Sequence, residues 1–490
     1  MAQLFLLCAA LCVASAPLAA DFCGANVTQA WASRCAGSAG SGRVHLAAFF
    51  DNANDPAKEG HFRLAVDMIN NHTDGWYDEL LDDTVLEALA VSSNCDSVLA
   101  ARGFWSAWQS WGRPLHGIVG ARCSGASMAI AAIAGHDRVP QISMSSTSAA
   151  LSDTRKYPYF FRTVAPDNEK GLVGAIVQML VGFQWRHVSL IQTDAAYAHM
   201  LGTEFEKAWV SGGDRSIAYL HTIHGAATSS NNALSKEAIH QALKGVPSDD
   251  VEVNSRVIVL AAHQHHAFKI VEQARDPKYG GAFLDTIFVH SLPPNDYTAT
   301  GSGVDKPKWM PRVPGYLGVV PLASTSAAHA AYLSRLNAHE EALGRPQFVR
   351  LPAYVAETVD AVVSFAKVLD PLSHEDRANG SLVREQLRTL SFSGVSGNVA
   401  FTAAGDRKDP RYTVINLGEG NEWKVVGSVG TVADTAELRV GEVCWADAGC
   451  GLAAAPLDRY RLPAVPAASN LVVIVLAAVG IPIMLVMIFM

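Results

Sequence analysis

The chain has 490 residues, a formal net charge of −8 and 17% charged residues. This length exceeds that of one ordinary domain and suffices for two large lobes. The charge balance excludes a nucleic-acid-binding protein of the usual kind, which needs a clustered basic face.

The chain opens on a short apolar segment. Residues 4–16 read LFLLCAALCVASA, and small residues follow up to Ala20. We interpret residues 1–20 as a secretory signal peptide, because the segment is too short to span a bilayer. The usual positive charge near Met1 is missing.

Strand-like and helix-like segments then alternate. RVHLAAFF at 43–50 predicts a strand, and the next segment places Phe62, Ala65, Val66 and Ile69 on one face of a helix. The elements expected after these are strands near 84–90, 115–121 and 139–143 and helices from about 97 and at 124–134. This alternation predicts βαβ units and a mostly parallel, doubly wound sheet.

The alternation resumes after Pro166 and indicates a second α/β half. The expected elements are helices at 168–182, from Tyr197 and near 266–274, with strands at 187–192, 256–262 and 286–291. Residues 293–315, rich in Pro and Gly, are predicted to form a long surface loop. Helices near 327–343 and 352–369 and strand-like segments at 391–401 and 411–417 follow. Two similar halves predict two lobes.

The last segment, Leu471 to Met490, is wholly apolar. A helix of this length, at about 1.5 Å per residue, spans the roughly 30 Å of a bilayer core. We therefore predict a transmembrane helix at 471–490 behind a linker at 431–470. The alternative is a glycosylphosphatidylinositol signal at Ala453–Ala455, although its spacer would exceed the usual run of about 8–12 residues. Release from intact cells by a phosphatidylinositol-specific phospholipase would identify that alternative.

The cysteines and sequons fit an exported protein. Cys8 and Cys12 lie in the predicted signal peptide, and the remaining cysteines form an even set suited to disulfides. The simplest local pairing, one of fifteen, joins Cys23 with Cys35, Cys95 with Cys123 and Cys444 with Cys450. The N-glycosylation sequons, a motif that also arises by chance, lie at Asn26, Asn71 and Asn379.

A run of hydroxyl residues follows the apolar strand at 139–143. The segment VPQISMSSTSAALSD, residues 139–153, contains Ser143, Ser145, Ser146, Thr147 and Ser148. One interpretation is a solvated turn, since Ser, Thr and Asp bond their own backbone and stop regular structure. The other is a ligand-binding loop, because α/β sheets bind small molecules beyond the carboxyl ends of their strands.

Three blocks of sequence carry a resemblance to a known family. They are GIVGARCSGASMAIAAIAGHDRVPQISMSSTSAALSDTRKYPYFFRTVAPD at 117–167, FQWRHVSLIQTDAAY at 183–197 and FSGVSGNVAFTAAGDRKDPRYTVINL at 392–417. In order and spacing they resemble the receptor-family ligand-binding region. That is the Venus-flytrap fold of class C G-protein-coupled receptors and natriuretic-peptide receptors, similar to periplasmic amino-acid-binding proteins.

The resemblance covers about residues 43–430 and implies a two-lobed, periplasmic-binding-protein-like (type 1) fold in an extracellular domain at 21–430. In this family the two lobes close on their ligand. The implied segments are 43–165 and 326–405 for lobe 1, and 166–325 and 410–430 for lobe 2. It also implies a lobe-1 disulfide between Cys95 and Cys123 and a dimer through lobe 1.

Ligand-binding residues follow from the same resemblance. In glutamate-type receptors a serine and a threonine grip an amino acid, and the matching loops CSGAS and MSSTS place Ser124 and Thr147 there, with Ser145 nearby. A helix N-terminus favours a carboxylate, which hydroxyls can orient. Asp167 would pair with an ammonium group, and Tyr197 would press its ring against it. In the plainer interpretation Ser124 and Thr147 are caps and turns, and Asp167 starts a helix.

The sequence departs from the resembled subfamilies at the far end of the ligand. The strand IFVHS runs into LPPND, so Asp296 does not inherit the lobe-2 aspartate of glutamate-type receptors. Tyr354 stands where receptors for γ-aminobutyric acid of type B carry a glutamate, and Glu357 is out of register. The cysteine-rich module of glutamate-type receptors is also absent, which is closer to the type B arrangement.

Other polar residues suggest different chemistry. His263, His265, His266 and His290 follow neighbouring strands. A metal or pH-sensitive site would use such a cluster, but the spacing matches no standard zinc pattern, which favours solvent-facing histidines. Asp51, Asp55 and Glu59 after the first strand are interpreted as solvated loop charges. The chain has none of the motifs G-x-S-x-G, H-E-x-x-H, G-x-G-x-x-G or the P-loop, so we predict no enzyme, metal or cofactor.

We therefore expect a cell-surface receptor ectodomain that closes on a small, amino-acid-like ligand and signals through a membrane segment. One alternative is a membrane-tethered solute-binding protein without signalling. The other is a structural or peptide-binding ectodomain that has lost its small ligand.

Overall fold

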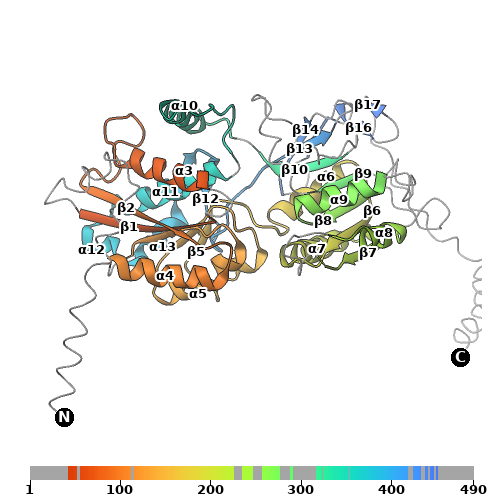
Figure 1. Cartoon of the computed structure of the whole chain (residues 1–490), viewed down its shortest axis with the longest axis horizontal. Helices are drawn as coiled ribbons and strands as arrows, with labels where there is room; N and C mark the ends of the chain where they lie inside the picture. Colours follow the sequence, from red (N-terminus) through yellow and green to blue (C-terminus); the bar gives the residue numbers. More distant parts are fainter. Residues whose placement is uncertain are drawn as a thin grey trace, which may run out of the picture. The chain divides into compact units, whose positions relative to one another are not determined.

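The computed structural model divides the chain into two units (Figure 1). The residues described are 42–51, 56–111, 115–225, 234–246, 257–275, 287–290, 316–322, 324–352, 354–417, 423–431, 436–439, 442–445 and 449–450. Unit 1 comprises Met1–Val164, Thr325–Arg345 and Ala353–Lys408, and unit 2 comprises Ala165–Ser324, Pro346–Pro352 and Asp409–Met490. Residues 346–352, expected in lobe 1, thus group with unit 2.

The terminal predictions concern residues outside the described ranges. They are the signal peptide at 1–20, the Cys23–Cys35 pair, the Asn26 sequon and the membrane segment at 471–490. Within the described residues, no helix combines the length and the apolar character that crossing a bilayer requires.

Unit 1 contains a five-stranded parallel sheet, as the strand–helix alternation predicted. Its strands are β1 (Gly42–Phe50), β2 (Thr84–Ser92), β3 (Gly117–Val119), β4 (Gln141–Ser143) and β5 (Phe160–Arg162), in the order β2-β1-β3-β4-β5. The interior strand β1 is an almost continuous apolar run that is buried from Leu46 to Phe50. Such runs occur where helices cover both faces of a sheet.

Helices cover both faces of this sheet (Figure 1). On one face, α4 (Ser97–Trp111) and α5 (Ser124–His136) pack Phe104 and Ile130 against Phe49 of β1. On the other face lie α3 (Pro56–Ile69) and α11 (Val355–Leu369), and the ring of Phe62 lies 5.4 Å from that of Phe50. Phe62, Ala65, Val66 and Ile69 are all buried, which confirms the predicted helical face.

The remaining elements of unit 1 complete this lobe. They are the 3₁₀ turn η1 (Ala149–Ser152), α10 (Ala327–Ala342), α12 (His374–Arg377), α13 (Gly380–Thr389) and the hairpin of β11 (Ser391–Gly394) and β12 (Gly397–Ala400). The Asp360 carboxylate of α11 accepts hydrogen bonds from the backbone N–H groups of Val395 and Ser396 in the hairpin turn, at 2.6 and 2.8 Å. Burial raises the pKa of Asp360.

Unit 2 contains a mixed eight-stranded sheet. Its strands are β6 (His187–Thr193), β7 (Ser216–Ile223), β8 (Val257–Ala261), β9 (Ile287–His290), β10 (Leu317–Pro321), β13 (Tyr412–Leu417), β14 (Trp423–Val429) and β15 (Glu437–Leu438). Their order is β15-β14-β13-β10-β9-β8-β6-β7. Strands β6 to β10 pair in parallel, and β13 to β15 are antiparallel additions.

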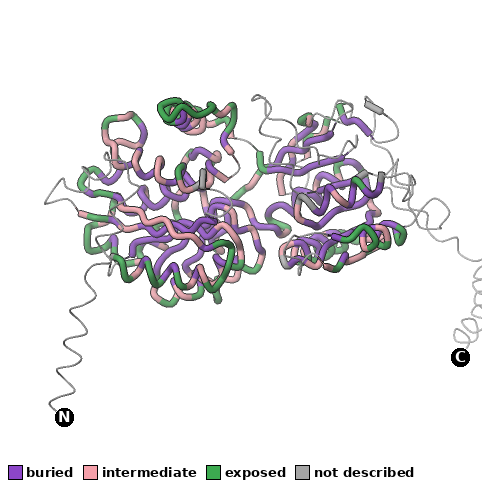
Figure 2. Tube along the Cα trace, in the orientation of Figure 1, coloured by how far each residue is buried: buried purple, intermediate pink, exposed green. Residues whose placement is uncertain are grey.

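Two apolar clusters sandwich this sheet, and its strands are mostly buried (Figure 2). One cluster contains Leu180 of α6 (Leu172–Gly182) and Trp209 of α7 (Ala196–Val210). The other contains Ile239 of α8 (Lys236–Lys244) and Phe268 of α9 (Gln264–Arg275).

A short ladder of β16 (Cys444–Trp445) and β17 (Gly449–Cys450) closes the described part of unit 2. Cys444 and Cys450 are direct partners in this antiparallel ladder, and Cys444 is disulfide-bonded. This register is compatible with the predicted Cys444–Cys450 pairing.

Candidate functional site

The strand order of unit 1 marks the place where a ligand would bind. Ligands of doubly wound sheets bind beyond the carboxyl ends of the strands, where the strand order reverses. In the order β2-β1-β3-β4-β5 the reversal lies between β1 and β3. The segments that leave this edge are Asp51 after β1, residues 120–123 after β3 and residues 144–148 after neighbouring β4.

Most hydroxyls of the serine run bind the neighbouring loop. The Ser143 and Ser145 hydroxyls donate to the carbonyl oxygens of Ala121 and Arg122 at 2.7 and 2.9 Å. The buried Ser146 hydroxyl lies 3.0 Å from the same Ala121 oxygen. The run is therefore no solvated turn, because its hydroxyls tie the β4 loop to the β3 loop. A ligand role for Ser145 remains a prediction.

Thr147 differs from its neighbours. Its side chain is half-buried, and neither its hydroxyl nor its N–H makes a hydrogen bond to any described residue. Ser124 lies close by, since its hydroxyl oxygen accepts a hydrogen bond from the N–H of Ser148 at 3.2 Å. Of the predicted unit 1 residues, Thr147 has the most unused hydrogen-bonding capacity.

The amino end of α5 completes this edge. Its N-cap is Cys123, whose side chain makes no capping hydrogen bond, so the positive end of a 13-residue helix faces the loops. The disulfide between Cys123 and Cys95, implied by the resemblance, is present with the two Cα atoms 5.2 Å apart.

Asp51 corrects one prediction at the same edge. We expected a solvated loop carboxylate, but Asp51 is only 3% exposed and lies 3.5 Å from the Arg122 guanidinium. Glu59 pairs with Arg63 one turn later on α3, and Asp55 lies outside the described residues.

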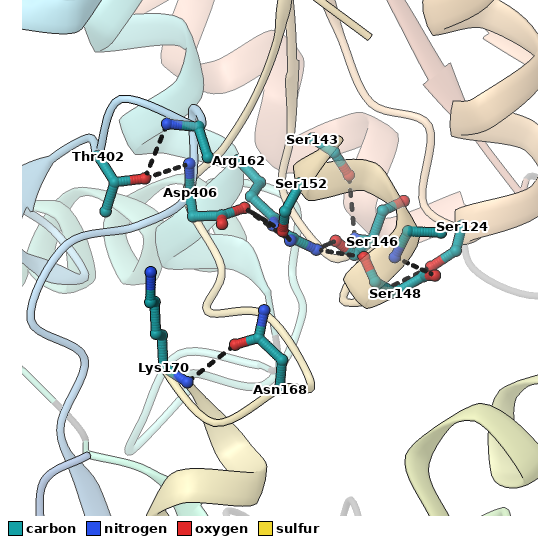
Figure 3. Close-up of polar contacts among 12 residues, drawn as sticks. Ser124, Ser143, Ser146, Ser148, Ser152, Arg162, Asn168, Lys170, Thr402 and Asp406 are labelled. Atoms are coloured by element: carbon teal, nitrogen blue, oxygen red, sulfur yellow. Dashed lines mark hydrogen bonds and ion pairs between the residues drawn. The ribbon is translucent and has the colours of Figure 1, made fainter. Parts of the chain in front are cut away.

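A buried arginine behind the serine run was not predicted (Figure 3). Arg162, at the end of β5, donates through Nε to Asp406 Oδ1 at 2.7 Å and through Nη1 to the carbonyl oxygens of Ser146 and Ser148. In the sequence, Arg162 lies in the segment FFRT and Asp406 in the segment GDR, both within the blocks that resemble the family. Their pairing could not be seen, because 244 positions separate them.

Gly405 explains how Asp406 reaches Arg162. It has φ +79°, a left-handed conformation that glycine adopts without steric cost. A Cβ at this position would lie 2.1 Å from the carbonyl oxygen of Phe160 on β5. The turn therefore packs directly on β5, and the N–H of Arg162 donates to the Gly405 carbonyl at 2.9 Å.

In unit 2 the strand order reverses between β6 and β8, where Tyr197 of α7 lies. Its ring stacks on that of His263, with centroids 5.2 Å apart and planes 24° apart. Burial lowers the pKa of His263, and nearby His266 lowers it further. Both effects disfavour the protonated form of His263 in this ring pair.

The other predicted unit 2 residues are also buried. Asp167 is 5% exposed and does not start a helix, since α6 begins at Leu172. The next residue, Asn168, accepts a hydrogen bond from the N–H of Lys170 (Figure 3). His266 and His290 are fully buried, so the prediction of solvent-facing histidines is wrong for these two, while His263 is half-buried and the side chain of His265 is outside the described part. The described residues contain no cluster of metal-ligating side chains.

Two sequons lie in the described part of unit 1. The Asn379 side-chain oxygen caps α13 by accepting from the N–H of Ser381 at 3.1 Å. Its Nδ2, the atom that carries an N-linked glycan, is not used by this cap. Asn71 accepts a hydrogen bond from the Thr73 hydroxyl of its own sequon at 2.9 Å.

A shallow groove of about 430 Å³ lies elsewhere in unit 2. Its lining residues are Leu322, Thr413, Val425, Gly427, Ser428, Glu437, Leu438 and Arg439. Most of these residues belong to the antiparallel strands β13–β15, and Leu322 follows β10, away from the point between β6 and β8 where the strand order reverses. The topology therefore favours the loops described above as the ligand site.

Comparisons with known proteins identify the family of the chain. Residues 59–420 match the family model described as receptor family ligand binding region. The metabotropic glutamate receptor-like protein E of Dictyostelium discoideum is 28% identical over 317 residues, 62% of this chain and 35% of that protein.

Two mouse proteins show similar matches. Metabotropic glutamate receptor 4 is 22% identical over 399 residues, 70% of this chain and 42% of the receptor. Gamma-aminobutyric acid type B receptor subunit 2 is 24% identical over 400 residues, 76% of this chain and 39% of the subunit. The chain thus spans less than half the length of these curated relatives.

Proposed function

The chain belongs to the receptor family ligand-binding region, and on this premise we propose that it binds a small, amino-acid-like ligand as the extracellular part of a cell-surface receptor. The names of its relatives refer to glutamate and γ-aminobutyric acid, each with a carboxylate and an ammonium group. The role is binding rather than catalysis, and a membrane segment transmits the signal.

The observation that carries this proposal is Thr147 with its unused hydroxyl and N–H beside Ser124 and the amino end of α5. Hydroxyl and amide donors at a helix N-terminus suit a carboxylate, because both the hydrogen bonds and the helix dipole favour negative charge. In unit 2 we propose Asp167 and Tyr197 as contacts of an ammonium group, supported by the stacking of the Tyr197 and His263 rings.

A thermal-shift screen tests the function. The chain is heated with a panel of amino acids that includes L-glutamate and γ-aminobutyric acid. A ligand that binds only the folded state stabilises it by about 2.7 kcal/mol at a hundred times its Kd, which raises the melting temperature. If no amino acid shifts the melting temperature, the proposed ligand class is wrong.

Replacing Thr147 or Ser124 with alanine should weaken binding of the amino acid identified in that screen. Loss of one charge-assisted hydrogen bond corresponds to about 1.5–3 kcal/mol, or roughly tenfold or more in Kd. Isothermal titration measures the change. Thr389→Ala, which removes an exposed hydroxyl on α13, is the control and should leave Kd unchanged. Unchanged affinity in both site variants would refute the carboxylate contact.

We also propose a dimer through unit 1, as the resemblance implies, and we place its contact surface on α4. Trp105 is 46% exposed and Val98 is 68% exposed, and seven positions of helix bring both to one face. Exposed tryptophan is enriched at the centres of protein interfaces.

Trp105→Glu should therefore weaken the dimer by about thirtyfold or more, as expected for a central interface residue. Sedimentation equilibrium measures the change. Leu382→Glu on α13, where the native leucine is 38% exposed, is the control and should leave self-association intact. Equal behaviour of the two variants would exclude α4 as the contact surface.

A further inference from the structure

All three nitrogens of the Arg162 guanidinium group, which has five N–H bonds, donate hydrogen bonds. Nε donates to Asp406 Oδ1 at 2.7 Å, and Nη2 reaches the same oxygen at 2.6 Å and the Ser152 hydroxyl at 2.7 Å. Nη1 donates to the carbonyl oxygens of Ser146 and Ser148 at 3.0 and 2.9 Å. The side chain is fully buried.

The two carbonyl contacts lie on either side of Thr147. Because each peptide unit is planar, holding the Ser146 carbonyl also fixes the plane that contains the Thr147 N–H. The next peptide plane, between Thr147 and Ser148, is held by the hydrogen bond that the Ser148 N–H donates to the Ser124 hydroxyl. Arg162 and Ser124 thus fix the two planes that set φ and ψ of Thr147.

Asp406 supplies the charge that keeps Arg162 in place. A buried guanidinium without a carboxylate is costly, so the pair is retained only where its geometry is well satisfied. Asp406 is itself held by Thr402, whose hydroxyl accepts the Asp406 N–H at 3.2 Å and whose own N–H donates to the Asp406 carbonyl at 2.8 Å. Figure 3 shows this chain of contacts from Thr402 through Asp406 and Arg162 to the serine run.

We propose that Arg162, neutralised by Asp406, is a positioning residue that holds the backbone of Thr147 in its ligand-binding conformation without touching the ligand. This inference rests on the proposed function.

Hydrogen exchange of the full chain tests the positioning role without any ligand. In Arg162→Lys the positive charge remains, but one nitrogen replaces the forked guanidinium. Peptides covering residues 144–151 include the hydrogen-bonded amides of Ser146 and Ser148. Their exchange should become about tenfold faster, while the strands of unit 1 keep their protection.

Arg377→Lys is the matched control. Arg377 is a buried arginine of unit 1 that donates to the Leu369 carbonyl and to the Thr84 hydroxyl, next to the amino end of β2. This variant should leave exchange in 144–151 unchanged. If Arg162→Lys leaves that exchange unchanged too, or if both variants accelerate it equally, Arg162 has no positioning role.

A double-mutant cycle links the positioning to binding, with L-glutamate and γ-aminobutyric acid as probes. Thr147→Ala should weaken binding about tenfold in the natural chain but less than about twofold in the Arg162→Lys background. An equal loss in both backgrounds would overturn the inference. If the natural chain binds neither probe, the proposed ligand class is at fault, and the exchange comparison still decides the role of Arg162.

Discussion

Replacing Asp406 with alanine is expected to lower the free energy of unfolding of unit 1 by about 3–5 kcal/mol. The reason is that Arg162 is fully buried and cannot be rehydrated without disrupting the core. Removing the Asp406 carboxylate leaves the buried positive charge of Arg162 without a counter-charge. Breaking a buried pair is therefore far more costly than never having formed it.

The measurement is a urea titration read by hydrogen exchange of unit 1 peptides, which separates this unit from unit 2. Asp153→Ala is the control, because Asp153 pairs with the largely exposed Arg155 and screened surface pairs contribute little. Replacing both partners, as in Arg162→Met with Asp406→Leu, should recover part of the loss. A destabilisation no larger than that of the control would show that the pair contributes little.

Removing the Cys95–Cys123 disulfide should cost about 3–4 kcal/mol. The bond joins cysteines 28 positions apart, so its loss restores conformational freedom to the unfolded chain. Urea titration of the Cys95→Ala/Cys123→Ala variant measures the effect. Reduction of the natural chain also breaks the disulfide of Cys444, so the double variant gives the value for this bond alone.

Peptide mapping without reduction provides the control for this prediction, and it should recover the two cysteines in one linked fragment. Free thiols at both positions in exported protein would contradict the pairing. Equal stability of the variant and the oxidised chain would show that the bond does not stabilise unit 1.

The pattern of apolar residues in the sequence predicted the strands that are buried on both faces of their sheets. β1 and β8 are continuous apolar runs, so they stand out from their surroundings. The edge strand β7 was missed because its residues SIAYLHTI are mostly half-exposed and mix apolar with polar side chains. β5 and β10 were also missed.

The candidate site was harder to predict because its organisation depends on long-range contacts. The resemblance pointed to Ser124 and Thr147, but composition could not tell the bonded Ser143 and Ser146 from the unbonded Thr147. Asp51 looked like a solvated loop residue because its partner Arg122 lies 71 positions further along the chain. The pattern of neighbouring residues in the sequence gives no information on contacts between residues so far apart.

The discontinuity of unit 1 has a consequence for protein synthesis. Arg162 leaves the ribosome 244 positions before Asp406 does, and the main segment of unit 2 is made in between. At about 5–20 residues per second, the arginine waits on the order of 10 to 50 s for its carboxylate. Throughout that interval the nascent lobe contains an uncompensated charge at the centre of an incomplete core. The hydrogen-bonded surroundings of Arg162 are therefore completed only late in synthesis.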